Sequence, residues 1–172
     1  MIRFTSILYF LVILVTSCPG GEPDHPNPSV TNKLRDTIKN TDSVFVYEGL
    51  PHQMFESELL KTEKKRKDIT TIAGYPFYTP KVQVQGKAEE IVKSIITDPN
   101  KFIRFQGEKL CGGFHPDYAV EWSDGDKTYS ILFCYGCGEV LIVDRKNTYR
   151  YDFKFSDDFK KIFTTFGLKR PK

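Results

Sequence analysis

The sequence has little excess charge of either sign, and this excludes one large class of partners. Its 25 lysine and arginine residues stand against 22 aspartate and glutamate residues, so the formal net charge is only +3. A protein that binds nucleic acid usually carries a clear basic excess, gathered on one face. We therefore expect no nucleic-acid partner.

The sequence also lacks a hydrophobic run that is long enough to cross a membrane. The unbroken apolar run at residues 7–15 has nine residues, whereas a membrane-spanning helix needs about 20. A run of this length that follows a positive residue, here Arg3, is typical of a secretory signal peptide. This pattern predicts export rather than a membrane span.

The common catalytic motifs are missing as well. The sequence contains no nucleophile elbow, no phosphate-binding loop, no zinc-protease helix motif and no paired-carboxylate motif. An ordinary hydrolase is therefore disfavoured, and we lean towards a protein that is not an enzyme. The chain is nevertheless 40% hydrophobic and 14% aromatic over 172 residues, which is enough for one folded domain with its own core.

The apolar run ends in the sequence Val15-Thr16-Ser17-Cys18. This resembles the lipobox of bacterial lipoproteins, in which an aliphatic residue and two small residues precede the cysteine that becomes the new N-terminus. The resemblance implies that Cys18 carries acyl chains such as palmitate and that the lipid bilayer is a partner of the protein. It also implies a place in the cell envelope, on the inner or the outer membrane, with the domain outside the cytoplasm.

The chain divides into three parts by composition. Residues 1–17 form the predicted signal peptide, and residues 18–42 form a flexible lipidated tether, because four prolines and two glycines fall within residues 19–29. Residues 43–172 form one globular domain. An antiparallel sheet of four to six strands with about three helices, two of them on one face, is expected there, so the fold class is α+β.

Hydrophobic periodicity places the elements of this domain. Helices are expected at residues 53–67, with Met54, Phe55 and Leu59 inward, at residues 88–97, and after Ser156 as N-cap. Strands are expected at residues 44–47, 81–85, 118–122, 129–133, 140–143 and 149–155.

The strongest local signal is a β-hairpin around Asp124-Gly125. If these two residues form the turn, the numbers of paired residues sum to 249, which places Val120 opposite Tyr129 and Tyr118 opposite Ile131. The same register sets Cys134 opposite His115. All apolar residues then share one face of the sheet.

The hairpin register gathers four residues that have metal-binding or redox chemistry. Cys111 and His115 precede the first strand, and Cys134 and Cys137 follow the second. Three alternatives stay open for this cluster. A disulfide suits an exported domain, a tetrahedral zinc site suits three thiols and one imidazole, and a reactive thiol needs His115 or Asp117 to tune a thiolate at Cys134 or Cys137.

Two stretches resemble segments of uncharacterised bacterial exported proteins. They are residues 111–122 (CGGFHPDYAVEW) with the following C-x-x-C at 134–137, and residues 48–52 (EGLPH). The resemblance covers residues 44–155 and implies no known activity. It adds His52 as a secondary candidate site residue, in a loop between a strand and a helix.

Two function classes follow from these observations. The first is a membrane-anchored lipoprotein of the cell envelope that acts as a binding or structural module and carries a Cys/His cluster. The alternative is a thiol-dependent or zinc-dependent accessory protein of the envelope. The sequence names neither a substrate nor a protein partner.

Overall fold

The computed structural model describes residues 28–171 apart from positions 108, 111, 146 and 168. The predicted signal peptide, Cys18 and Cys111 lie outside the described residues. In chain order the elements are α1 (Pro28–Asn40), β1 (Val44–Glu48), α2 (Ser57–Glu63), β2 (Ile69–Ile72), β3 (Tyr75–Tyr78), β4 (Val82–Val84), α3 (Lys87–Thr97), a 3₁₀ turn (Pro99–Lys101), β5 (Phe102–Arg104), β6 (Tyr118–Asp124), β7 (Lys127–Cys134), β8 (Glu139–Asp144), β9 (Asn147–Phe153) and α4 (Asp157–Thr164).

Seven of the strands form one antiparallel sheet in the order β4-β1-β6-β7-β8-β9-β5. The middle of this sheet is the meander β6–β9, whose consecutive strands pair through short turns. The short strands β4 and β5 form the two edges. A separate hairpin pairs β2 with β3. The fold class is therefore α+β, which confirms the prediction from the sequence.

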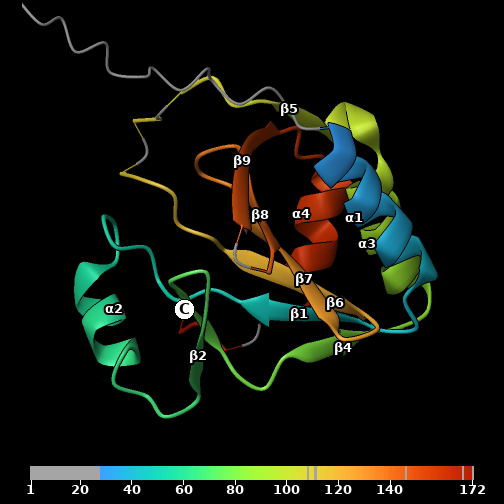
Figure 1. The fold of residues 1–172 in the computed structure, drawn as a ribbon. Helices are drawn as coiled ribbons and strands as arrows, with labels where there is room; N and C mark the ends of the chain where they lie inside the picture. The colour runs from blue at the N-terminus through green and yellow to red at the C-terminus, as the bar shows by residue number, and fades with distance from the viewer. Residues whose placement is uncertain (1–27, 108, 111, 146, 168, 172) are drawn as a thin grey trace, which may run out of the picture.

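Helices α1, α3 and α4 cover one face of the sheet (Figure 1). Each has apolar residues at helical spacing, as in Val30, Leu34 and Ile38 of α1, and buries that stripe against the strands. On the sheet side, the buried residues include Val120, Ile131 and Phe133 at alternate positions of β6 and β7. This layer contains the main hydrophobic core.

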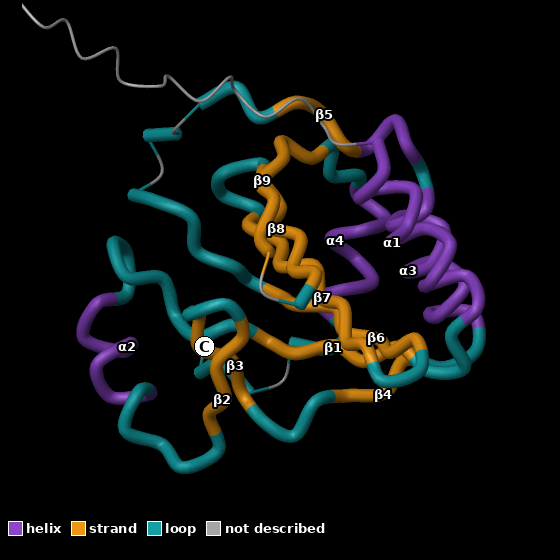
Figure 2. Tube along the Cα trace, in the orientation of Figure 1, coloured by secondary structure: helices purple, strands orange, loops and turns teal. Residues whose placement is uncertain are grey.

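The opposite face of the sheet is covered only in part. The β2–β3 hairpin and α2 lie on that side, away from the three other helices (Figure 2). Phe77 of the hairpin packs with Ala119 and Leu132 of the sheet. A second small cluster joins Leu50, Leu60 and Tyr78 beneath α2. We call this side the second face.

The structure confirms the elements with the clearest periodicity. The predicted helix at residues 88–97 corresponds to α3, and the predicted N-cap is present because the Ser156 side chain accepts a hydrogen bond from the Phe159 amide. The strands predicted around the two hairpins of the meander correspond to β6–β9.

Two assignments near the N-terminus were wrong. Residues 28–40, which we placed in the flexible tether, form the core helix α1, because Pro28 can start a helix and the apolar stripe after it can be buried. The helix expected at residues 53–67 is only Ser57–Glu63. Met54 and Phe55, expected inside, are exposed.

The register of the first hairpin also differs from the prediction. Asp124 pairs with Lys127, so the turn residues are Gly125 and Asp126 and the paired numbers sum to 251. Val120 lies opposite Ile131 and Tyr118 opposite Phe133, two positions away from the expected partners. A slip of two residues leaves every side chain on its predicted face, so the alternation in the sequence cannot detect it.

The sheet is also larger than expected. It contains seven strands instead of four to six, because the edge strand β5 was not predicted, and three helices instead of two share one face. The separate β2–β3 hairpin was not predicted either. Among the described residues, no helix combines the length and the apolar character that a membrane span requires.

Candidate functional site

The described site residues lie at one end of the meander, where β6 begins and β7 ends. Asp117 immediately precedes β6, Cys134 is the last residue of β7, and Cys137 lies in the turn that leads to β8. The Asp117 amide donates to the Phe133 carbonyl at 2.7 Å, and its Oδ2 accepts from the Tyr135 amide at 2.8 Å. These two bonds hold the start of β6 against the end of β7.

The loop after β1 brings His52 to the same place. The Gly49 amide donates to the Asp117 carbonyl at 2.7 Å, and a side chain at Gly49 would collide with the carbonyl oxygen of Pro116. This close approach of two backbones requires a glycine. The rings of His52 and His115 consequently lie 4.6 Å apart between centroids.

Both histidines have one ring nitrogen engaged by the backbone. His115 Nε2 lies 2.8 Å from the Leu50 carbonyl, to which it donates, and His52 Nδ1 accepts from the Met54 amide at 3.0 Å. Burial lowers the pKa of His115, and the charge of the neighbouring His52 acts in the same direction. The His115 ring is therefore held in its neutral form near pH 7.

Cys134 is a buried free thiol. Its residue is 1% exposed, and burial raises the pKa of the thiol although the backbone N–H groups of His115 and Cys137 face the sulfur. A thiol with a raised pKa stays protonated at neutral pH and is a poor nucleophile. This environment does not favour the reactive-thiol interpretation.

Cys137 is disulfide-bonded, and its partner lies outside the described residues. Its Sγ lies 3.4 Å from the Gly113 carbonyl oxygen, so the segment before His115 passes close to this sulfur. The predicted cluster of Cys111, His115, Cys134 and Cys137 is thus described for three of its four members. The contacts of His115 and Cys137 with Cys134 place those three together.

The donor set does not fit a tetrahedral zinc site. A sulfur in a disulfide is no thiolate ligand, and His115 Nε2 already donates to a carbonyl, so two of the four proposed ligands have other partners. Within the described ranges, no group of three or more His, Cys, Asp or Glu side chains is arranged to hold a metal ion.

Sequence reasoning missed one residue of this site, Arg170 near the C-terminus. Its guanidinium donates to the carbonyls of Gly49 at 3.0 Å and Leu50 at 2.8 Å, and it lies 3.7 Å from Asp117 Oδ1. The buried carboxylate of Glu48 accepts from its backbone amide. No local pattern signals this role, because the partners lie more than 50 positions earlier in the chain.

Beside the histidine pair, two large apolar side chains are exposed to solvent, Met54 and Phe55. Met54 packs against Gly112, and the His52 ring contacts the Phe55 ring at 4.8 Å between centroids. The end of the meander therefore combines a rigid, hydrogen-bonded interior with an apolar exterior. This arrangement suits structural support or protein contact better than chemistry.

Comparisons with known protein families, with characterised proteins and with solved structures find no match to this chain.

Proposed function

We propose that this chain is a lipid-anchored protein of the bacterial cell envelope and that its domain works as a binding or structural module outside the cytoplasm. The disulfide at Cys137 carries the proposal. Disulfides persist in oxidising compartments and are rare in the cytoplasm. A disulfide therefore agrees with the export that the signal-like segment at residues 1–17 predicts.

We assign the partner of Cys137 to Cys111. The chain has four cysteines, of which Cys134 is free, so only Cys18 and Cys111 remain. Gly113, two residues after Cys111, has its carbonyl oxygen 3.4 Å from Cys137 Sγ. Cys18 is then left for the acyl chains, which insert into the bilayer and contribute about 0.8 kcal/mol for each buried CH₂.

The alternative function, thiol-dependent or zinc-dependent chemistry, has weaker support. Its thiol candidate Cys134 is buried and has a raised pKa, and its zinc set loses the Cys137 thiolate to the disulfide. A structural use of the cluster explains the burial of Cys134, the raised pKa of its thiol and the disulfide at Cys137. The disulfide, the histidine and the buried thiol together fix the loops at the end of the meander.

Detergent phase partitioning of the exported protein tests the anchor. The wild type is expected in the detergent phase and Cys18→Ala in the aqueous phase, because only that thiol can take the diacylglyceryl group. Cys134→Ala is the matched control and should partition like the wild type. Recovery of wild type and Cys18→Ala in the same aqueous fraction would contradict the lipid anchor.

Intact mass with and without reductant and chelator tests the cysteine assignment. Without reductant, alkylation in denaturant should label one cysteine of the mature protein; after reduction it should label three, since Cys18 is acylated. A chelator should change neither number. A third free thiol before reduction, together with bound zinc, would instead support the alternative function.

A further inference from the structure

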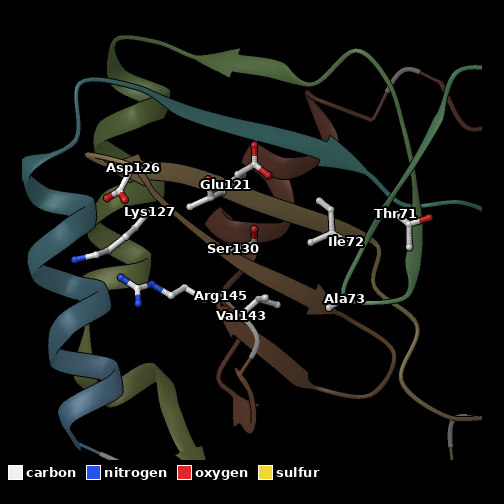
Figure 3. Close-up of a pocket in the computed structure, with 10 residues that line it drawn as sticks. Thr71, Ile72, Ala73, Glu121, Asp126, Lys127, Ser130, Val143 and Arg145 are labelled. Carbon is white, nitrogen blue, oxygen red and sulfur yellow. The ribbon is translucent and has the colours of Figure 1, made fainter.

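A cleft of about 640 Å³ lies on the second face, at the opposite end of β7 from the cysteines. Its floor is the sheet, one wall is the turn of the β2–β3 hairpin, and the turns that follow β6 and β8 close its other side (Figure 3). Sites for small molecules commonly have volumes of about 300–1,000 Å³. The cleft exists because the hairpin covers only part of the sheet.

The cleft is lined by hydroxyl side chains. Ser130 is 4% exposed and lines the floor of the cleft. Thr128, two residues earlier on the same strand, and Thr71 of the hairpin line the cleft too. A hydroxyl group can both donate and accept a hydrogen bond, so this lining suits a ligand that carries hydroxyl groups of its own.

Two cationic side chains line one side of the cleft. Figure 3 shows the charged ends of Lys127 and Arg145 gathered on the same side, beside the turns of the two hairpins. Neither forms an ion pair with the residues that the structure describes. Like charges repel each other, and a carboxylate between them would remove that repulsion and accept two parallel bonds from the guanidinium.

Two acidic residues line the cleft, Asp126 and Glu121, and Glu121 is neutralised elsewhere. Glu121 Oε1 accepts from Lys81 Nζ at 2.6 Å and from the Tyr47 hydroxyl at 3.3 Å. Burial, together with the charge of Glu121, raises the pKa of Tyr47 to about 12, so this phenol keeps its proton. Glu121 is thus a poor partner for Lys127 and Arg145. Asp126 forms no ion pair with either cation among the described residues, and its single charge leaves this side of the cleft with a positive excess.

We propose that this cleft binds a small carboxylate that also carries hydroxyl groups, such as a sugar acid. Its carboxylate lies between Lys127 and Arg145, and its hydroxyls reach Ser130 and Thr128 on the floor. The proposal goes beyond the proposed function and depends on neither the lipid anchor nor the disulfide, because every residue that it uses lies at the other end of the sheet.

The test is an NMR titration of the ¹⁵N-labelled domain with D-galacturonate, with D-galactose and sulfate as comparison probes. Galacturonate should cause saturable shifts at the amides of residues 126–130 and 143–145. Galactose offers hydroxyls without the charge, and sulfate offers charge without the hydroxyls. The dissociation constant of each should therefore exceed that of galacturonate by about tenfold or more.

The variants Lys127→Ala and Arg145→Asn should each weaken galacturonate binding about tenfold, and Ser130→Ala should weaken it to a smaller extent. Asparagine is chosen because Arg145 has a φ of 58°, a conformation that asparagine tolerates. Lys154→Ala removes an exposed charge outside the cleft and is the matched control, with unchanged binding expected. The amide spectrum of each variant reports whether it is folded.

Three results would overturn the proposal. They are the absence of saturable shifts at tens of millimolar galacturonate, shifts that persist in the folded double variant of Lys127 and Arg145, and sulfate binding as tight as galacturonate binding. The last result would leave an anion site without recognition of hydroxyls, which is a different ligand class.

Discussion

The two faces of the seven-stranded sheet are built from the same strands but differ in what covers them. On one face, α1, α3 and α4 join the sheet in a single cluster of 21 buried residues. On the second face, the sheet and the β2–β3 hairpin share a cluster of only three, Phe77, Ala119 and Leu132. These numbers refer to the part of the chain that the structure describes.

This difference separates the face that stabilises the fold from the face that carries the proposed sites. Burial of apolar area is the main favourable term in folding, so most of the stabilisation comes from the face with the helices. The second face leaves room for polar groups, and it holds the buried thiol of Cys134, the side chain of Ser130 and the paired carboxylate of Glu121. Three predictions test this division, beginning with the largest expected effect.

Replacing Phe163 with alanine should have the largest effect. Phe163 is fully buried, and its ring stacks on Phe159 at 4.2 Å between centroids and contacts Phe133 and Tyr118. Truncation of such a ring costs about 3–5 kcal/mol of unfolding free energy when the cavity cannot collapse. The measurement is urea unfolding of both proteins.

The matched control for this prediction is Phe55→Ala, which removes a ring that is 73% exposed on the other side of the molecule. It should change the unfolding free energy by less than about 0.5 kcal/mol. A loss of less than about 1 kcal/mol in Phe163→Ala would mean that α4 contributes little to the core, and the contrast between the faces would fail.

Thr37→Val should have an intermediate effect. The indole Nε1 of the fully buried Trp122 donates to Thr37 Oγ1 at 3.0 Å, which connects β6 to α1. Valine keeps the shape but removes the acceptor, and an unsatisfied buried donor costs about 1–3 kcal/mol. Thr62→Val makes the same change on the exposed side of α2 and should be nearly neutral; equal losses in the two variants would refute the role of this bond.

His115→Gln should have the smallest effect, visible only as a change in pH dependence. Since burial lowers the pKa of His115 below its ordinary 6.5, the unfolded chain binds more protons than the folded chain as pH falls below that value. The contribution of His115 to stability is therefore present above pH 6.5 and is lost as pH falls through the lowered pKa.

Urea unfolding of both proteins at about pH 7.5 and about pH 5 provides the measurement. The wild type should lose more unfolding free energy between the two conditions than His115→Gln, because glutamine can still donate to the Leu50 carbonyl but does not titrate. Equal losses would show that the pKa of His115 is the same in the folded and the unfolded chain. The second face would then lack this pH sensitivity.

The sequence alone determined the elements whose signals are local. Apolar residues at helical spacing in residues 88–97, the cap at Ser156 and the alternation through the meander placed α3, α4 and β6–β9 on the correct faces, because each pattern repeats within one element. The sequence also pointed to Cys111, His115, Cys134 and Cys137 through the hairpin register and their chemistry. Asp117 was added as a residue that tunes a thiolate, and His52 was added through the resemblance.

Only the tertiary structure decided the features that depend on partners distant in the chain. The stripe of Val30, Leu34 and Ile38 was present in the sequence, but whether it is buried depends on the sheet that covers it. The hairpin register was fixed by pairing across both neighbouring strands rather than by the turn residues. Arg170 contacts Glu48 and Asp117 only because folding brings together segments that are distant along the chain. Lys127 and Arg145 line the same cleft for the same reason, and no local pattern signals it.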